Sequence, residues 1–447
     1  MYSKILIANR GEIAVRIIRA CREMGIKTVA VYSTVDRESL HVGLADETIC
    51  IGPAAASESY LKIPAIISAA EVSGADAIHP GYGFLSEDSA FAEKCVASNI
   101  DFIGPKHSII KMMGDKIGGR QAAQNAGVPT IPGTKGALNN KREALEASEK
   151  IGFPLIIKAK AGGGGKGMRV VYSKSNFLKS FDLAKLEGEA AFGNGDVFIE
   201  KYLQNPRHIE VQVLGDKFNN YIHLGERDCS LQRRHQKIIE ESPASNLPDK
   251  VREKMWSASI RLIQDIGYDS AGTIEFLVDD QYNFYFIEMN TRLQVEHPIT
   301  EIITGIDLVK EQIKISAGEK LGITQQDVNF NNHAIECRIN AESPTNFMPS
   351  PGKIIRYREP GGFGVRVDSG VYQGYDVVPY YDSLLAKLIC FGKDRNEARI
   401  RMLRALDEYQ IDGIETIIPL QYRILSSLYY EEGKIHTGLV ESLLKEI

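Results

Sequence analysis

Three stretches of the sequence bring together residue types that can bind anions, hold a metal ion or move a proton. The first, PLIIKAKAGGGGKGMRVV at 154–171, is rich in glycine and lysine. The second, TIEFLVDDQYNFYFIEMN at 273–290, carries glutamates in two neighbouring apolar segments. The third, EMNTRLQVEHP at 288–298, alternates charged or polar residues with mostly apolar ones. Phosphate binding, metal binding and acid–base chemistry are therefore the functions to consider.

The glycine-rich stretch predicts a phosphate-binding loop. Four consecutive glycines at 162–165 can let backbone N–H groups approach an anion closely. Lys158 precedes the loop and Lys166 lies in it, and either can contact phosphate oxygens. Gly167 stands where a Walker A loop has serine or threonine, so that motif is excluded. The alternative is the tip of a flexible hairpin.

The second stretch predicts a β-hairpin with two opposed carboxylates. With a four-residue loop at 280–283, Glu275 faces Glu288 across the strand pair. Like charges in that arrangement are destabilising unless a cation lies between them. The same register pairs Leu277 with Phe286 and Asp279 with Phe284.

Residue alternation places Asn290 on the same face as Glu288. Two carboxylates and an amide oxygen are ligands that suit Mg²⁺. Phe284 and Phe286 are expected on this face as well, which favours an enclosed metal site over the alternative, a solvent-facing acidic strand. The prediction depends on register, because a slip of one residue moves every side chain to the other face.

The third stretch predicts a site for a small oxyanion. If the strand continues past 290, its even-numbered positions form one face with Arg292, Gln294 and Glu296. Arg292 can bind an oxyanion through two hydrogen bonds, and Glu296 can take a proton from it. A salt-bridged strand edge explains the same pattern, and the residues alone leave both interpretations open.

A basic segment, RDCSLQRRHQKIIEESP at 227–243, indicates a local anion site in a chain that is acidic overall. Isolated members of the segment, such as Arg227, are equally consistent with a surface position. His297 precedes a proline and is expected to be structural. The cationic members of the segment are Arg227, Arg233, Arg234, His235 and Lys237.

The elements that must position these residues fall into two kinds. The N-terminal part alternates strands and helices and predicts a Rossmann-like parallel sheet, although its first turn, ANRGEIA, has one glycine where a dinucleotide site needs three. Residues from 204 onward predict mostly antiparallel strands, and two helices are expected to close the chain. The predicted N-terminal elements are strands at 4–8, 27–32, 76–78 and 100–103 and helices at 13–24 and 87–98.

Composition narrows the functional classes. The 447 residues allow two to four domains, and 53 basic against 58 acidic residues give a net charge of −5, which argues against broad nucleic-acid binding. Six cysteines without CxxC spacing suggest neither a zinc site nor a disulfide framework. The N-terminus lacks a signal peptide, and no apolar run reaches the roughly 18 residues of a membrane helix. We expect a cytoplasmic protein that does not contact a membrane.

At this point the sequence resembles a known family. GGGGKGM, ERDCSLQRRHQK, FIEMNTRLQVEHP and ECRINAE resemble the biotin carboxylase family of the ATP-grasp superfamily. ILIANRGEIAVRIIRA and HPGYGFLSED near the N-terminus and PSPGKI, VDSGVYQG and YYDSLLAKLI near the C-terminus agree with the same family. The resemblance covers essentially the whole chain, and its motifs are long and dispersed.

The resemblance implies a nucleotide site and a metal site. ATP is expected between a glycine-loop lid and the C-terminal domain, and Mg²⁺ or Mn²⁺ on Glu275 and Glu288 beside Asn290. Lys166 departs from the family pattern, which has arginine there, so its phosphate contact is in doubt. The residues implied for nucleotide binding are Lys116, Lys158, Gly163, Gly164, Gly165, Glu200, His208, Gln232 and His235.

The resemblance also implies a bicarbonate site and a biotin site. Lys237, Arg292, Gln294 and the backbone of Val295 are implied to hold bicarbonate, and Glu296 to deprotonate it. The reaction then passes through carboxyphosphate. Arg338 is implied to stabilise the biotin enolate, and Tyr82 to border the biotin site.

The implied organisation is an N-terminal biotin carboxylase domain (1–114), a connecting helical segment (115–130), an ATP-grasp lid (131–203) and a C-terminal catalytic domain (204–447). No biotin-attachment motif of the AMKM type and no carboxyltransferase domain is recognised, so the chain resembles the separate subunit of acetyl-CoA carboxylase. A homodimer working with a biotin carboxyl carrier protein and carboxyltransferase subunits is expected. The alternatives are the subunit of a two-subunit pyruvate carboxylase, another ATP-grasp ligase and a non-catalytic ATP-binding protein.

Overall fold

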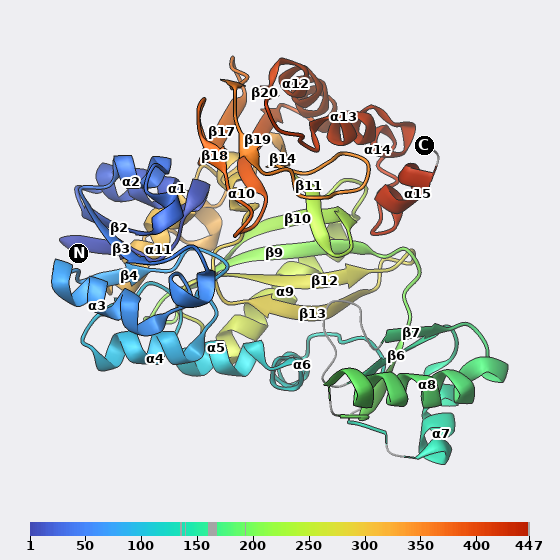
Figure 1. Ribbon diagram of the computed structural model, residues 1–447. Helices are drawn as coiled ribbons and strands as arrows, with labels where there is room; N and C mark the ends of the chain where they lie inside the picture. Colours follow the sequence, from blue (N-terminus) through green and yellow to red (C-terminus); the bar gives the residue numbers. More distant parts are fainter. Residues whose placement is uncertain (135, 139, 160–167, 193, 446–447) are drawn as a thin grey trace.

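Figure 1 shows the chain as three groups of elements around a large central sheet. It is a computed structural model that describes every residue except 135, 139, 160–167, 193 and 446–447. The predicted phosphate loop, with Gly163, Gly164, Gly165 and Lys166, therefore lies outside the described residues. Within them, no helix is long and apolar enough to cross a membrane.

The N-terminal sheet is parallel, and helices cover both of its faces (Figure 1). Its strand order is β3-β2-β1-β4-β5, which confirms the predicted Rossmann-like arrangement. Apolar residues at helical spacing, such as Ile13 and Ile17, turn one side of α1 into the core. The strands are β1 (Lys4–Ile7), β2 (Lys27–Ser33), β3 (Glu47–Gly52), β4 (Ala77–His79) and β5 (Asp101–Phe102). The helices are α1 (Gly11–Glu23), α2 (Leu40–Leu44), α3 (Ile63–Ser73), α4 (Ser89–Ala97), α5 (His107–Gly114) and, from later in the chain, α11 (Leu308–Ser316).

A small unit stands apart at the lower right of Figure 1. Its sheet has the order β7-β6-β8 and shares one apolar core with two helices. The unit follows α6 (Lys116–Asn125), which begins at Lys116 and is capped by the side chain of Asp115. Its elements are α7 (Lys141–Ile151), β6 (Leu155–Ala159), β7 (Met168–Val171), α8 (Lys174–Phe192) and β8 (Val197–Lys201).

The central sheet is antiparallel, with the order β13-β12-β9-β10-β11-β14-β19-β17. Apolar side chains of β9, β12 and β13 pack on α9 (Asp249–Asp265), and those of β14 and β19 pack on the C-terminal helices. The strands are β9 (Arg207–Gly215), β10 (Tyr221–Arg233), β11 (Gln236–Ser242), β12 (Ala271–Val278), β13 (Phe284–Asn290), β14 (His333–Asn340), β17 (Val365–Ser369) and β19 (Leu384–Gly392). This antiparallel sheet confirms the second half of the predicted fold class.

The end of the chain is more divided than the sequence predicts, since four helices and a short strand replace the two expected helices. Ser427 shows the reason: its backbone is extended, and its side chain caps the next helix, so the helical run breaks there. The elements are α12 (Arg395–Glu408), β20 (Gln410–Asp412), α13 (Ile418–Ser426), α14 (Leu428–Glu431) and α15 (Leu439–Lys445). Short strands β15 (Gly352–Lys353), β16 (Arg356–Arg358) and β18 (Asp376–Val377) precede them.

The predicted hairpin forms, with one correction to its register. Glu275 pairs with Glu288, as predicted, but a bulge follows on β13, so that Phe276 pairs with Phe286. The predicted opposition of Leu277 to Phe286 and of Asp279 to Phe284 is therefore wrong. The additional residue, Ile287, points outward, and the bulge lets both Phe286 and Met289 reach the core under the sheet. Glu288 is consequently exposed and does not share a face with the aromatic side chains.

Candidate functional site

A row of charged side chains crosses four strands of the central sheet. Arg227 on β10 pairs with Glu210 on β9, Glu210 pairs with Glu275 on β12, and Glu275 pairs with Glu288 on β13. Three carboxylates in adjacent positions repel one another unless cations lie between them. The contacts of this row define the central charge cluster, which comprises Glu210, Arg227, Lys237, Glu275, Glu296 and Arg338.

Lys237, from β11, is the cation that compensates most of this repulsion. Its Nζ donates to Glu210 at 2.6 Å, to Glu275 at 3.0 Å and to Glu296 at 2.6 Å. Burial alone would lower the pKa of Lys237, but the Cys229 thiol and the three carboxylates outweigh it and raise the pKa well above its usual range. Lys237 therefore stays charged and holds three strands and a loop together.

Glu296 lies between two cations. Its Oε1 accepts from Lys237 at 2.6 Å, and its Oε2 accepts from the Arg338 guanidinium at 2.9 Å. Burial disfavours the charged form, yet Lys237, Arg338 and Arg227 together hold the pKa of Glu296 well below its usual range. The second arm of Arg338 donates to Glu240 at 2.6 Å, which fixes the guanidinium plane. Glu296 is thus ionised at neutral pH.

The segment that delivers Glu296 is not a strand, contrary to the conditional prediction. Strand β13 ends at Asn290, residues 291–296 form a loop, and α10 (His297–Thr304) begins at His297. Pro298 in the first turn explains the early start of the helix. His297 is fully buried, and its Nδ1 lies 2.8 Å from the Gln294 carbonyl oxygen, consistent with the structural role predicted for it.

The loop nevertheless brings the expected side chains to one place. Gln294 donates to Glu275 at 2.7 Å and accepts from Arg227 at 2.8 Å. Arg292 donates to Glu87 at 2.8 Å and to Asn290 at 2.8 Å, so its guanidinium is already partnered on the rim of the cluster.

The position of Arg227 shows that its surface interpretation is wrong. It is completely buried and donates to Glu210 at 2.5 Å. Such burial is tolerated because its other donors are satisfied as well. The further acceptors are Gln212, Thr273, Gln294 and Thr300.

Two acidic positions remain as candidates for a metal ion. Glu275 is buried and bound by Lys237, Asn290 and Gln294, and His208 Nε2 lies 2.9 Å from its second oxygen. Glu288 has no ion pair within the part of the chain that the structure describes. Desolvation and the nearby charges of Glu275 and Glu87 raise its pKa. This uncompensated carboxylate opposite Glu275 fits an oxygen-coordinated cation.

Two other groups of possible ligands around Glu210 fit a metal ion less well. Atoms of His208, Glu210 and Glu275 lie within 4.8 Å of one another, as do those of Glu210, Cys229 and Glu296. Lys237 already donates to all three of these carboxylates. A metal ion there would have to displace the ammonium group.

Tyr82 approaches the cluster through Lys387. The Lys387 Nζ lies 5.7 Å from the centre of the Tyr82 ring, 3.0 Å from Glu12 and 3.1 Å from the Val295 carbonyl oxygen. Lys387 stands opposite Arg338 in the pairing of β14 with β19. These contacts place Tyr82 and Val295 at the border between the N-terminal sheet and the cluster.

The predicted nucleotide residues fall into two groups. Gln232 and His208 lie on the central sheet, and His235 is exposed at the tip of the β10–β11 hairpin. Lys158 and Glu200 belong to the small unit, where Lys158 donates to Glu200 at 2.6 Å. Lys116 is exposed at the start of α6.

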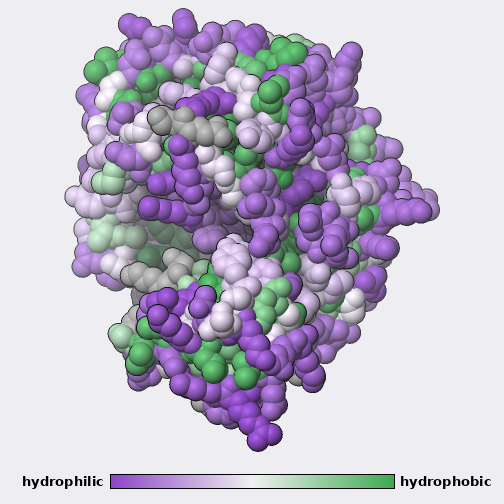
Figure 2. Space-filling view, turned by 90° about the vertical axis from the view of Figure 1, so that its right-hand side faces the viewer, coloured by the Kyte–Doolittle hydropathy of each residue, from purple (hydrophilic) through white to green (hydrophobic). Residues whose placement is uncertain are grey.

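Arg120 connects the small unit to α6. Its guanidinium donates to Glu200 at 2.6 Å and to the carbonyl oxygen of Ile131 at 2.7 Å. The surface is hollowed between the small unit, at the bottom of Figure 2, and the body above it, with hydrophilic side chains over much of the rim. The two groups of predicted residues thus come from opposite sides of a polar recess.

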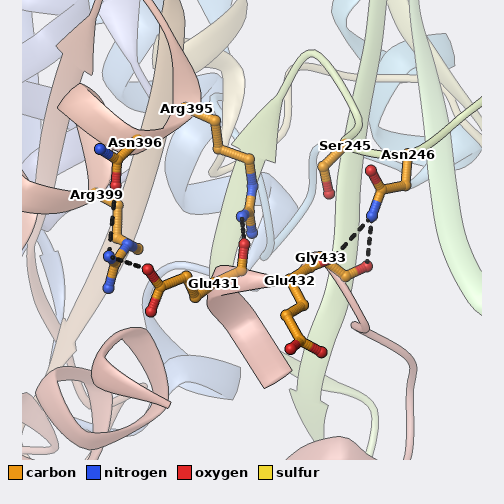
Figure 3. A pocket seen from close by; sticks show the side chains of 8 residues that line it. All are labelled: Ser245, Asn246, Arg395, Asn396, Arg399, Glu431, Glu432 and Gly433. Atoms are coloured by element: carbon orange, nitrogen blue, oxygen red, sulfur yellow. Dashed lines mark hydrogen bonds and ion pairs between the residues drawn. The ribbon is translucent and has the colours of Figure 1, made fainter. Parts of the chain in front are cut away.

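A separate polar pocket contains none of the predicted site residues. It lies where Arg395 and Arg399 of α12 face Glu431 of α14, and its volume is about 180 Å³ (Figure 3). Arg395 donates to the Glu431 carbonyl oxygen, and Arg399 pairs with the Glu431 carboxylate at 3.2 Å. Every charged side chain in this pocket has an ion-pair partner, because Arg395 pairs with Glu241 and Glu432 pairs with Lys434 as well. The pocket therefore does not compete with the central cluster as a candidate active site.

Comparison with known proteins identifies the family. Family models match at residues 1–110 ("Biotin carboxylase, N-terminal domain"), 115–324 ("Carbamoyl-phosphate synthase L chain, ATP binding domain") and 336–442 ("Biotin carboxylase C-terminal domain"). The biotin carboxylase of Pseudomonas aeruginosa is 56% identical, over 99% of this chain and 99% of that protein. The chain belongs to the biotin carboxylase family. The predicted resemblance is thereby confirmed, and the chain is an ATP-dependent ligase of this family.

Two further relatives belong to carboxylases that are named for other substrates. A pyruvate carboxylase subunit of Methanothermobacter thermautotrophicus is 53% identical and matches 100% of this chain and 91% of its own length. A solved structure of the biotin carboxylase domain dimer of Hydrogenobacter thermophilus 2-oxoglutarate carboxylase, in complex with MgADP, ADP and bicarbonate, has a TM-score of 0.91 and 49% identity. It covers 99% of this chain and 98% of that one.

Several residues in or around the candidate site of this biotin carboxylase family member were not predicted from the sequence. Glu210 could have been found, because it follows His208 by two positions on the same strand and therefore shares its face. Glu240, Lys387 and Arg120 act through contacts between distant segments, for which the sequence carries no local signal.

Proposed function

We propose that this biotin carboxylase family member uses ATP to activate bicarbonate and transfers the carboxyl group to biotin on a biotin carboxyl carrier protein. The proposed setting is the first half-reaction of acetyl-CoA carboxylase, which leads to malonyl-CoA and fatty acid synthesis. The observation that carries the proposal is Glu296, an ionised carboxylate between Lys237 and Arg338. A base flanked by two fixed cations suits a reaction in which each step builds negative charge.

Bicarbonate is proposed to enter beside Glu296. Lys237, Arg292, Gln294 and the backbone of Val295 would hold its oxygens, and Glu296 would take its proton. The resulting oxyanion attacks the γ-phosphorus of ATP and displaces ADP, which gives carboxyphosphate. Cleavage of carboxyphosphate yields CO₂ and phosphate, and the phosphate takes the ureido proton of biotin before biotin attacks CO₂.

Arg338 is proposed to stabilise the enolate that biotin forms when it loses this proton. Its two hydrogen bonds to carboxylates keep the guanidinium in a fixed plane. Tyr82, which lies near Lys387 at the edge of the cluster, is proposed to border the biotin ring.

Mg²⁺ or Mn²⁺ is proposed to bind Glu275 and Glu288 with Asn290 beside them. Their oxygen ligands and the unpaired charge of Glu288 fit such an ion, which when bound would neutralise charge on the phosphates of ATP. In the protein itself, Glu275 also orients His208, Lys237 and Gln294.

The nucleotide is proposed to lie in the recess between the small unit and the central sheet. Lys116, Lys158 and the glycines at 163–165 would contact phosphates, Glu200 and the following backbone would hold adenine, and residues 131–203 would act as a lid. The other proposed domains are the N-terminal domain (1–114), the connecting helical segment (115–130) and the C-terminal catalytic domain (204–447). His208, Gln232 and His235 would line the opposite side.

We also propose a cytoplasmic homodimer that works with carrier and carboxyltransferase subunits. The six free cysteines suit a reducing compartment, and the related structure from Hydrogenobacter thermophilus is described as a dimer. The alternative acceptor is pyruvate, as the name of the Methanothermobacter relative indicates for that protein.

The decisive experiment measures ADP release by the purified chain with ATP, Mg²⁺ and bicarbonate, with and without free biotin. Release that requires bicarbonate and is stimulated by biotin supports the proposal. ATP binding without any response to biotin or to biotinylated carrier proteins contradicts it. The same assay with the biotinylated carrier protein of an acetyl-CoA carboxylase, and separately with that of a pyruvate carboxylase, then distinguishes the two acceptors.

A further inference from the structure

A second pocket lies across the central sheet from the charge cluster. Glu226 and Arg227 are neighbours on β10, so their side chains leave opposite faces of the sheet. Arg227 enters the cluster, whereas Glu226 lines a pocket of about 290 Å³. This volume lies near the lower end of the range for small-molecule sites. None of the residues predicted for catalysis, metal binding or nucleotide binding lines it.

One wall of this pocket is aromatic. Trp256 stacks on His223 with ring centres 4.4 Å apart and on Phe330 with ring centres 5.4 Å apart and an interplanar angle of 28°. Gly225 makes this possible, because a side chain there would meet the Phe330 ring at 2.8 Å. The Gly225 backbone has φ +81°, at an irregularity in the pairing of β10 with β9. Phe330 remains 39% exposed, so its ring is available to a ligand.

The charged side chains that line the pocket are mostly acidic. Glu226, Asp249 and Glu253 line it with a single cation, Arg252. Arg252 is already bound by Glu226 at 2.7 Å and by Asp249 at 2.6 Å. Glu253 is exposed and has no ion pair among the residues that the structure describes. Three carboxylates against one guanidinium leave a negative excess.

Neither His223 nor the N-terminus of α9 cancels this negative excess. Desolvation lowers the pKa of His223 to about 4, so the ring stacked on Trp256 is neutral at pH 7. The pocket also faces the first turns of α9, whose N-terminus carries about half a positive charge. That partial charge is smaller than the excess on the three carboxylates.

We propose that this pocket binds a small organic cation of the alkylammonium class, with its charge against the exposed part of the Phe330 ring and near Glu253. Aromatic faces attract such cations through their quadrupoles, and a neighbouring carboxylate adds a direct charge interaction. An anionic ligand is disfavoured by the three carboxylates. The site is independent of the carboxylation chemistry proposed for the opposite face.

Trp256 is the only tryptophan of the chain, so its fluorescence reports on this pocket alone. Choline is titrated into the full-length protein at constant ionic strength, and its neutral isostere 3,3-dimethyl-1-butanol is titrated in parallel. We expect a saturable change in emission with choline and a much weaker response to the alcohol. An equal response to both ligands, or no saturable response to choline, overturns the proposal.

Matched variants test the assignment to these residues. Glu253→Gln removes the free charge with little change of shape and is expected to weaken choline binding by about two- to fivefold, the scale of a partly exposed charge interaction. Phe330→Leu is expected to weaken it while the fold is retained. Glu319→Gln, an exposed carboxylate outside the pocket, is the control. Choline affinity that is unchanged in both pocket variants also overturns the proposal.

Discussion

The central charge cluster and the small three-stranded unit present their ionisable groups in opposite ways. In the cluster, Lys237, Arg227 and Arg338 are each held by at least two partners on different segments. In the small unit, Lys158 has Glu200 as its one partner among the residues that the structure describes, and Lys116 is exposed on the neighbouring helix. The difference teaches that one half of the recess holds its ionisable groups in a fixed geometry, which suits the proposed proton transfer, whereas the cations of the other half have fewer constraints, which suits the proposed contacts with ATP.

The largest effect is expected from the centre of the fixed half. Glu296→Gln keeps the shape of the side chain but removes the proposed base. We expect bicarbonate-dependent turnover to fall by about 10²- to 10⁴-fold, the usual contribution of a general base. Binding of ATP, measured by calorimetry, should stay within a few-fold of the unaltered protein. Equal loss of both properties contradicts the separation of the two halves.

Arg338→Gln tests the second cation that contacts Glu296 in the fixed half of the recess. Loss of this positive charge is expected to raise the pKa of Glu296, because Arg338 is one of the cations that lower it. The base is then protonated at higher pH, so the acidic limb of the pH–rate profile should move upward. Turnover itself should fall by about 10²- to 10³-fold. An unshifted limb in a folded variant would show that Arg338 does not control Glu296.

Glu288→Gln tests the metal ion that is proposed to bind between the two halves of the recess. We expect the Mg²⁺ concentration for half-maximal activity to rise by about ten- to hundredfold. In the unaltered protein the raised pKa of Glu288 means that protons compete with the metal as pH falls. Apparent Mg²⁺ affinity should therefore decrease toward acidic pH and lose much of this dependence in the variant. The same pH dependence in both proteins contradicts the assignment of Glu288.

The smallest effect is expected at the joint between the small unit and α6. Arg120→Gln removes the 2.6 Å ion pair with Glu200 and should change the KM for ATP by about two- to fivefold, with little change in kcat. Arg142→Gln, in an exposed pair on α7, is the matched control and should change neither constant. A large fall in kcat for Arg120→Gln would show that the small unit is as rigidly coupled as the cluster.

The sequence predicted the parts of the structure that depend on local pattern. Strand alternation was enough to predict a hairpin in which Glu275 faces Glu288, but the predicted four-residue loop was wrong. The strands are joined by residues 279–283, and Glu275 faces Glu288 only because the bulge on β13 offsets this longer connection. The bulge at Ile287 was not predictable, because it depends on Phe286 and Met289 both packing into a core formed by distant helices. Arginine is rarely buried, so a surface position was one of the two interpretations of Arg227. Its partners on four other segments make burial tolerable.

The threefold attachment of Lys237 has a consequence for which anions the protein can accept. Because the ammonium group already donates to Glu210, Glu275 and Glu296, an anion that binds Lys237 as proposed would have to replace one of these carboxylates. Affinity then depends on the difference between two ion pairs, and a spherical ion such as chloride gains little from the exchange. A planar, hydrogen-bonding oxyanion can recover what it displaces by also engaging Arg292 and Gln294. If bicarbonate binds here as proposed, the protein's own carboxylates would compete with it for Lys237, and this competition would disfavour anions that form weaker contacts.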